Sequence, residues 1–258
     1  MEPSAARAAA TGLLDAAGTG KPVPPLSLPI EDAYTVQAAQ VRLRADAGET
    51  VRGHRIAGAS VAARRRWKAT EPVHGTVFAG AFQPEHRPVA ASFIRPAAEA
   101  SVAFVLGTRL SGPEVTTADV LRAVAFVLPA LEITDSRIDD EEPGAADVAA
   151  DNASAGVVVL GASPVDLSTV DLRLAGCVLY RRGAVAATGA GGLALGSPVN
   201  ALAWLANSLS AQGFTLEPGQ VVLSGALTPP VAVSPGDSVQ ASIAGLGSVT
   251  TVLAEGQS

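Results

Sequence analysis

The sequence is poor in aromatic side chains, in charge and in cysteine. Of its 258 residues, 4% are aromatic and 16% are charged, whereas 48% are hydrophobic. A core of this composition must be built mainly from Ala, Val and Leu, and so low a charge predicts that other subunits cover part of the surface in a homo-oligomer. The one cysteine, Cys177, excludes an intrachain disulfide and a zinc site made of several cysteines.

The sequence also lacks the segments that direct a chain to a membrane or to nucleic acid. No apolar run reaches the roughly 18 residues of a membrane span, and no apolar segment precedes a cleavage site at the N-terminus. We therefore expect a cytoplasmic protein with no membrane partner. The formal net charge of −6 argues against a nucleic-acid partner, which selects a basic surface. No ordered Ser, His and Asp triad and no phosphate-binding glycine loop stands out.

Periodicity and turn residues predict an α+β fold in one integrated unit, with a helical N-terminal region at 1–65 and a β-rich domain at 66–258. Helices are expected at 4–17, 30–47 and 198–212, the last with Ser197 as N-cap and Pro198 at its first position. Residues 139–150 are expected to form an acidic loop, which leaves open a mobile lid. Short apolar runs predict strands at 100–106, 124–133, 157–160, 171–180, 184–188, 220–224, 232–233, 238–244 and 248–253.

One glutamate lies inside an apolar, strand-like run. This is Glu132, within the segment 129–138, and a small polar loop, 151–156, follows it. A carboxylate among Val, Leu and Ile costs free energy unless it is paired or binds a cation. The sequence therefore predicts a buried acidic site.

Several segments, taken in order, resemble one known family. The resemblance covers nearly the whole chain, and it is to the 2-keto-4-pentenoate hydratase and 4-oxalocrotonate decarboxylase family of the fumarylacetoacetate hydrolase superfamily. It implies a β-rich roll preceded by N-terminal helices. The segments that carry it are Gly20–Leu26, Glu31–Gln37, Gly53–Ile56, Ala103–Gly107, Pro129–Ile138, Asp151–Gly156, Gly196–Asn207, Leu223–Thr228 and Pro235–Asp237.

The resemblance also implies a chemistry. Members of this family bind Mg²⁺ or Mn²⁺ through three carboxylates, and the metal chelates the carboxylate and 2-oxo oxygens of a dienoate as a Lewis acid. Water then adds to the conjugated system, or carbon dioxide leaves. For this chain the resemblance implies a hydro-lyase or carboxy-lyase acting on a 2-hydroxydienoate or a small 2-oxo acid.

The metal positions of the family are only partly matched. The first two ligands form a Glu-x-Glu on one strand, and the matching residues here are Glu99 and Ser101, while the third ligand matches Glu132. A neutral hydroxyl replaces a carboxylate poorly, because Mg²⁺ favours charged oxygens. Binding of Mg²⁺ or Mn²⁺ through Glu99 and Glu132 is therefore expected to be weak or absent.

Other positions that the family uses have also changed. Arg55 stands where the family has a lysine; it keeps the charge but releases a proton far less readily. Val73 stands at an aspartate position, with His74 beside it. The resemblance makes Arg55, His74 and Ser154 the candidate catalytic residues. It makes Arg55, Ser154, Ser224 and Gly225 the candidate substrate-binding residues.

Two alternatives remain open at this stage. The neutral replacements at 73 and 101 are also consistent with a repurposed, metal-independent catalyst, for example for cyclisation, rearrangement or C–C cleavage of a larger polyketide-like substrate. A non-catalytic subunit that stabilises an active partner is the third interpretation.

Overall fold

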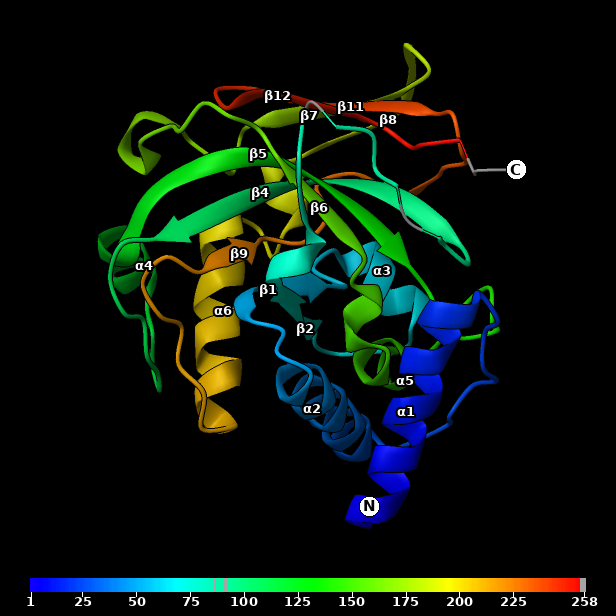
Figure 1. Ribbon diagram of the computed structural model, residues 1–258. Coiled ribbons are helices and arrows are strands. Elements are labelled where there is room, and N and C mark those ends of the chain that lie inside the picture. The colour runs from blue at the N-terminus through cyan, green and yellow to red at the C-terminus, as the bar shows by residue number, and fades with distance from the viewer. Residues whose placement is uncertain (86, 91, 256–258) are drawn as a thin grey trace.

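The computed structural model describes residues 1–85, 87–90 and 92–255. Two β-sheets are stacked, and helices surround the larger one (Figure 1). The strand order of the larger sheet is β2-β1-β9-β4-β5-β6-β3, and β10 adds to β4. Its strands are β1 (Val51–Ala57), β2 (Val73–Phe78), β3 (Phe82–Pro84), β4 (Pro96–Leu106), β5 (Val124–Asp135), β6 (Val157–Leu160), β9 (Val221–Leu223) and β10 (Val231–Ala232).

The centre of the larger sheet is the long antiparallel pair β4 and β5, whose register runs from Pro96 opposite Asp135 to Leu106 opposite Val124. Side chains alternate between the two faces of a strand. On β4, the even-numbered residues from Ala98 to Phe104 enter the large core with the second sheet and helix α6 (Pro198–Ala211). The odd-numbered residues of the same strand, among them Glu99, face the other way.

That second face is the inner face of a curl. A small apolar cluster lies on this inner face. Its six buried residues come from five strands of the larger sheet, and their side chains pack against one another. A sheet can bury such a cluster against itself only if it bends round on that side. The members are Val77, Ala103, Leu128, Ala130, Val158 and Leu223.

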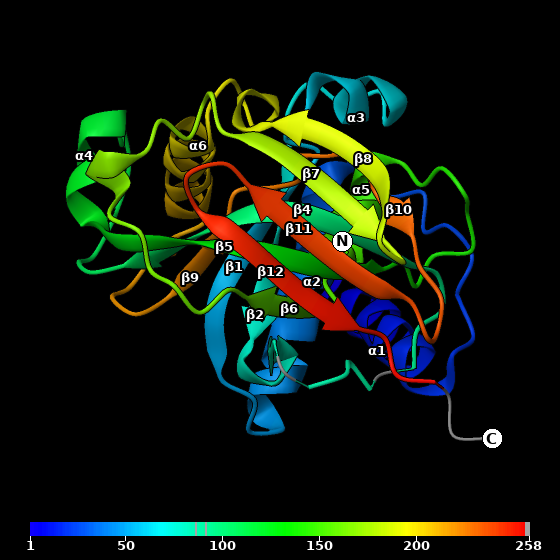
Figure 2. The ribbon, with the colours of Figure 1, turned by 90° about the horizontal axis from the view of Figure 1, so that it is seen from above.

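The second sheet covers the outer face of the first. Its order is β12-β11-β7-β8, and seen from above it lies over β4 and β5 (Figure 2). The strands are β7 (Gly176–Arg181), β8 (Ala184–Ala190), β11 (Ser238–Ile243) and β12 (Gly247–Val252). Their alternate residues, such as Leu179, Ala241 and Val249, are fully buried in the shared core.

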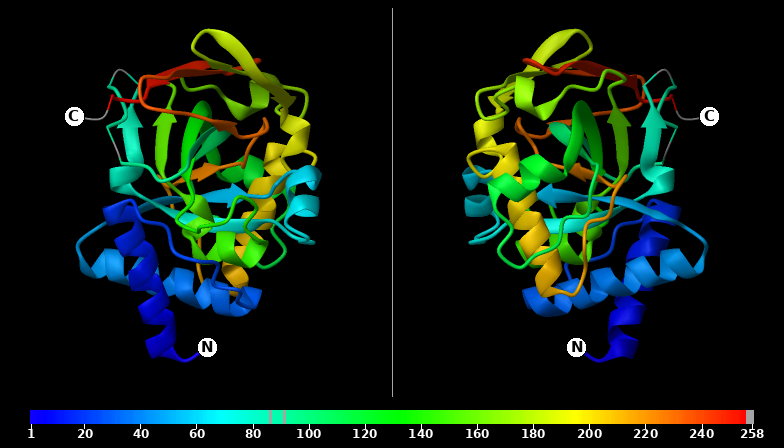
Figure 3. Two further views of the ribbon diagram at one scale, coloured as in Figure 1. Left: turned by 90° about the vertical axis from the view of Figure 1, so that its right-hand side faces the viewer. Right: turned by 90° about the vertical axis from the view of Figure 1, so that its left-hand side faces the viewer.

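The N-terminal helices lie at the end of the molecule opposite the second sheet (Figure 3). Helix α1 (Pro3–Thr19) buries Ala6, Ala10 and Leu13, which are spaced to share one helical face. They pack in one cluster with helix α2 (Ile30–Asp46) and with α5 (Ala145–Ala150). The remaining helices are α3 (Val61–Arg66) and α4 (Thr117–Ala123), and none of the helices within the described residues is long and apolar enough to cross a membrane.

Most predicted elements are present, and three expectations are wrong. Residues 51–57 lie in the region expected to be helical, yet they form the strand β1 between β2 and β9. Residues 145–150 of the expected acidic loop form α5, whose last four residues are buried. Residues 171–175 precede β7 rather than belonging to it. Ser197 occupies the N-cap position of α6, but its side chain makes no capping hydrogen bond.

Gly53 sets how closely β1 and β9 approach. A Cβ at this position would lie 1.8 Å from the Val221 carbonyl oxygen of the paired strand. We predict that Gly53→Ala lowers the free energy of unfolding by about 2–3 kcal/mol, because backbone rather than a flexible side chain must move. Urea denaturation measures this. Gly80→Ala is the control, since nothing lies within 4 Å of its Cβ; equal stability of the two variants would contradict the prediction.

Candidate active site

An arginine bridges two glutamates on the inner face of the curled sheet. Glu99 on β4 and Glu132 on β5 are directly opposite each other in the strand register. Arg55, on β1, donates from Nε to Glu132 Oε2 at 2.7 Å and from Nη2 to Glu99 Oε2 at 3.1 Å. Strand β9 lies between β1 and β4 but ends at Leu223, which pairs with both Arg55 and Ala103. The arginine therefore reaches across the sheet where the bridging strand stops.

The three groups are removed from water to different degrees. The side chains of Arg55 and Glu132 are 3% and 2% exposed, and that of Glu99 is 16% exposed. Arg55 Nη1 also donates to the Ala153 carbonyl oxygen. Glu132 Oε1 is buried without a hydrogen-bond partner. Because an unpaired buried charge is costly, the guanidinium is what allows both carboxylates to stay inside.

Burial raises the pKa of Glu99 to about 7. The charge of Arg55 opposes this rise, and the neighbouring Glu132 adds to it. The carboxyl group at the more exposed side of the cluster therefore changes protonation near neutral pH.

Ser101 and Ser224 form a separate hydroxyl pair next to the glutamates. Their Oγ atoms are 3.3 Å apart, and Ser101 Oγ also lies 3.4 Å from the Gly225 carbonyl oxygen. Ser224 Oγ accepts a hydrogen bond from the Val102 amide at 3.1 Å. Gly225 has φ +85°, and a Cβ there would come within 2.8 Å of Ala59. The structure thus brings Ser101, Ser224 and Gly225 together at the end of β9.

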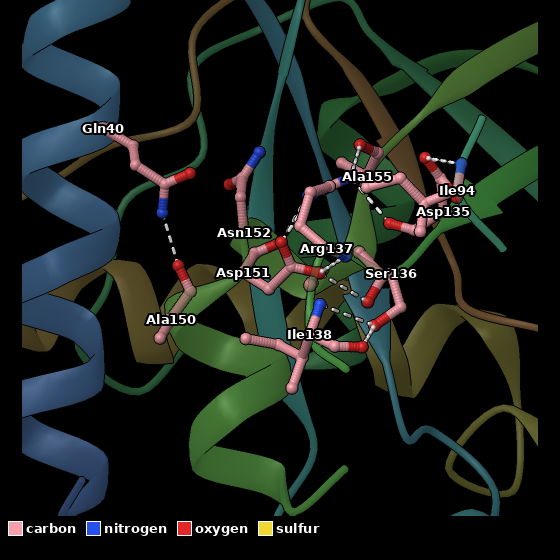
Figure 4. Close-up of polar contacts among 12 residues, drawn as sticks. Gln40, Ile94, Asp135, Ser136, Arg137, Ile138, Ala150, Asp151, Asn152 and Ala155 are labelled. Atoms are coloured by element: carbon pink, nitrogen blue, oxygen red, sulfur yellow. Dashed lines mark hydrogen bonds and ion pairs between the residues drawn. The ribbon is translucent and has the colours of Figure 1, made fainter. Parts of the chain in front are cut away.

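The loop that supplies the Ala153 carbonyl is held by a second buried ion pair (Figure 4). Arg137 donates from Nε to Asp151 Oδ1 at 2.6 Å, and from Nη2 to the Asp151 carbonyl oxygen at 2.6 Å. Burial raises the pKa of Asp151 to about 6, against the opposing charge of Arg137. Ser154 Oγ donates to Asp151 Oδ2 at 3.2 Å. This hydroxyl therefore supports the loop beside the site.

The same loop is pressed against β2. Asn152 accepts from the Thr76 amide at 2.7 Å and donates to the Thr76 carbonyl at 2.8 Å. A Cβ on Gly75 would lie 2.2 Å from the Asn152 carbonyl oxygen, so only glycine allows this approach. Asn152, Ala153 and Ser154 all have φ near +50°, an unfavourable conformation that these contacts hold in place.

His74 lies on the other face of the sheet from Arg55. In the β1–β2 register Arg55 is opposite Gly75, whereas His74 is opposite Ile56, a residue of the large outer core. The ring stacks on Tyr34 at 4.7 Å, and its Nε2 lies 3.0 Å from Gln212 Nε2. Burial, with a smaller contribution from neighbouring His54, lowers the pKa of His74 to about 3. The structure does not bring this candidate residue to the glutamate cluster.

The donor set does not suit a divalent metal ion. Within the described part of the chain, no group of three or more His, Cys, Asp or Glu side chains is placed to hold a metal. One oxygen of each glutamate is bonded to Arg55, and the Ser101 hydroxyl is directed to Ser224 and Gly225. An ion between the glutamates would therefore have to compete with a fixed positive charge.

Helices at the N-terminus, a curled sheet and a polar cluster on its inner face define a fumarylacetoacetate-hydrolase-like roll. The chain belongs to the fumarylacetoacetate hydrolase family, because the family model "Fumarylacetoacetate (FAA) hydrolase C-terminal" matches residues 31–254.

Two relatives and one solved structure illustrate the similarity. A 2-keto-4-pentenoate hydratase of Paraburkholderia xenovorans is 40% identical over 97% of this chain and 96% of its own length. A 2-hydroxyhexa-2,4-dienoate hydratase of Comamonas testosteroni is 38% identical over 88% and 87%. The structure of 4-oxalocrotonate decarboxylase from Pseudomonas putida G7, complexed with magnesium and adipate, superposes with a TM-score of 0.93 at 30% identity over 98% of each chain.

These similarities confirm three sequence predictions: the family, the α+β roll with N-terminal helices, and an enzyme of the hydratase or decarboxylase type. Sequence reasoning did not find the Arg137–Asp151 pair or the role of the Ala153 carbonyl. The sequence shows Arg137 near the end of one motif segment and Asp151 at the start of another, but only the fold shows that the two side chains meet.

The protonation of Glu99 predicts a pH dependence of stability. Its folded pKa of about 7 is above the ordinary 4.5, so the folded state keeps a proton that the unfolded state loses between these values. The free energy of unfolding should therefore fall by about 1–3 kcal/mol as pH rises from 4.5 to 7. Glu99→Gln should flatten this slope in urea denaturation at several pH values. Glu141→Gln, at an exposed position, is the control; an unchanged slope in Glu99→Gln would contradict the assignment.

Proposed function

We propose that this protein is a lyase that hydrates or decarboxylates a small 2-oxo acid or its 2-hydroxydienoate form. The observation that carries the proposal is the buried Arg55 on the inner face of the roll, with donors left over for a carboxylate. The names of the similar hydratases and of the decarboxylase support the substrate class.

Arg55 is proposed to bind and orient the substrate carboxylate. A guanidinium has five N–H donors; three are engaged by Glu132, Glu99 and Ala153, and two remain. An anion at these donors adds negative charge beside two glutamates, and the protonated form of Glu99 lessens that repulsion. The buried apolar cluster of the inner face, which includes Ala103, Leu128 and Leu223, keeps water away from that side of the site.

Ser154, Ser224 and Gly225 keep the roles predicted from sequence, as proposals, whereas His74 does not. Ser154 is placed next to Ala153, so its hydroxyl is proposed to orient the substrate or the attacking water. Ser224 and Gly225 line the same end of β9 and are proposed to contact the substrate. His74, as a neutral imidazole on the opposite face, is proposed to act only through the position of β2.

Metal dependence, assembly and location are further proposals. Glu99 and Glu132 are the residues that would bind Mg²⁺ or Mn²⁺, weakly or not at all, since both are bonded to Arg55. A cytoplasmic homo-oligomer remains the expectation from composition. Among the residues that the structure describes, no contact favours the alternative of a larger polyketide-like substrate.

Turnover of 2-hydroxypenta-2,4-dienoate and of a 2-oxo dicarboxylate, followed by loss of dienol absorbance and by carbon dioxide release, tests the proposal. We predict that Arg55→Lys lowers kcat/KM at least about tenfold, mainly through KM, because an ammonium cannot bind a carboxylate through two parallel hydrogen bonds.

Arg109→Lys is the control for this measurement, because Arg109 lies at the exposed surface, where it pairs with Glu217 at 3.5 Å and donates to Thr215 Oγ1 at 3.3 Å. It should leave kcat/KM unchanged. Failure of the wild-type protein to turn over any 2-oxo acid or dienoate, with and without added Mg²⁺, would count against the lyase assignment.

A further inference from the structure

The position between the two buried glutamates is already filled by a cation. Arg55 Nε and Nη2 lie 2.7 Å and 3.1 Å from the nearer oxygens of Glu132 and Glu99, and the side chain of Arg55 is 3% exposed. The glutamates are neighbours across β4 and β5, so whatever lies between them must contact both. In this chain that group is a guanidinium.

The surroundings are built for this guanidinium. The Ala153 carbonyl accepts from Nη1, and Ala153 holds φ +54° while doing so. The loop reaches this place because Gly75 lacks a Cβ and because the Arg137–Asp151 pair holds its other side. The guanidinium meets three acceptors from three separate nitrogens held in one plane, a spread that the single nitrogen of an ammonium does not provide.

The electrostatics disfavour a dication beside Arg55. Two glutamates and one arginine carry a formal net charge of −1, and adding a divalent ion would make it +1 in a buried site. The ion would also lie within a few ångströms of the guanidinium, where like charges repel strongly because water is excluded. The neighbouring Ser101 hydroxyl is neutral and already has partners.

We propose that the Arg55 guanidinium takes the place of a divalent metal ion between Glu99 and Glu132, so that the folded site needs no metal. The structure of the similar decarboxylase is complexed with magnesium, so we propose that this chain differs from that protein in needing no metal ion at this position. It concerns the site of the proposed function, but it does not depend on which reaction occurs there.

Titration of the wild-type protein with Mn²⁺, followed by the electron paramagnetic resonance signal of the free ion, is the direct test. We expect no binding at micromolar Mn²⁺ and no change in melting temperature with Mn²⁺ or with a chelator. A dissociation constant in the micromolar range for the wild-type protein would overturn the inference. It would leave the lyase proposal intact, because turnover is measured separately.

Removing the internal cation should create a metal response. In Arg55→Ala the two carboxylates lose their partner, and we expect Mn²⁺ to bind at least about tenfold more tightly than to the wild type and to raise the melting temperature. Arg137→Ala is the matched control: it also breaks a buried arginine pair, with Asp151, but leaves Arg55 between the glutamates. Mn²⁺ should not stabilise it.

A second pair of variants keeps the test decisive if Arg55→Ala does not fold. Ser101→Glu adds a third carboxylate on the same face as Glu99, and we expect Mn²⁺ binding to strengthen only when it is combined with Arg55→Met, which keeps an aliphatic side chain but removes the charge. Ser101→Gln combined with Arg55→Met is the neutral control. Tight Mn²⁺ binding by Ser101→Glu with Arg55 unchanged would contradict the claim that the guanidinium excludes the ion.

Discussion

Burial of two carboxylates on adjacent strands depends on the guanidinium of Arg55. Glu99 and Glu132 are directly opposite each other on β4 and β5, where like charges repel most strongly within a sheet. Loss of one partner of a buried ion pair typically costs about 3–5 kcal/mol. The register of the two central strands and the position of β1 are therefore coupled through one side chain. Hydrophobic packing on the outer face sets the fold, and this ion pair sets what the inner face contains.

The second buried pair extends this control to the loop at 151–155. Arg137 holds Asp151 from one side, and Arg55 holds the Ala153 carbonyl from the other. Between these anchors three successive residues adopt the left-handed conformation, which costs of order 1–3 kcal/mol for each non-glycine residue. Such a conformation persists only when contacts on both sides determine it. The wall of the site that carries Ser154 is thus fixed by the same two arginines that neutralise the buried acids.

How far the sequence predicts this molecule depends on which signal each element carries. Strands β4 and β5 are long apolar runs, and α1 shows helical spacing, so pattern alone finds them. Strand β1 contains Arg52, Gly53, His54 and Arg55, and strand β2 contains His74, Gly75 and Thr76; neither has an apolar alternation. Both are strands because tertiary pairing outweighs local preference. Polar residues of both strands are buried in the interior, so the alternation of apolar and polar residues that would predict a strand is missing there.

The candidate site was predicted less completely than the fold. Family resemblance indicated Arg55, Glu99 and Glu132 as residues of one interior site, and the geometry shows how they are hydrogen-bonded to one another. Resemblance also selected His74, which strand alternation places on the other face because its neighbour Gly75 is the residue opposite Arg55. A sequence motif shows which residues are neighbours along the chain. In a strand, however, the side chains of two neighbouring residues lie on opposite faces of the sheet, so a motif of adjacent residues cannot all face one site.

The substitutions at 55 and 101 are best understood as one change in the electrostatics of the inner face. At position 101 a hydroxyl, bonded to Ser224 and Gly225, adds no charge beside Glu99. At position 55 a guanidinium reaches both carboxylates and a backbone carbonyl at once. Two carboxylates need less compensating positive charge than three. The Arg55 guanidinium carries a single positive charge and is part of the chain, so it compensates Glu99 and Glu132 without having to bind from solution. The fold is shared at a TM-score of 0.93 with a decarboxylase complexed with magnesium, and on our proposal the strands of this chain hold a guanidinium, rather than an ion, between Glu99 and Glu132.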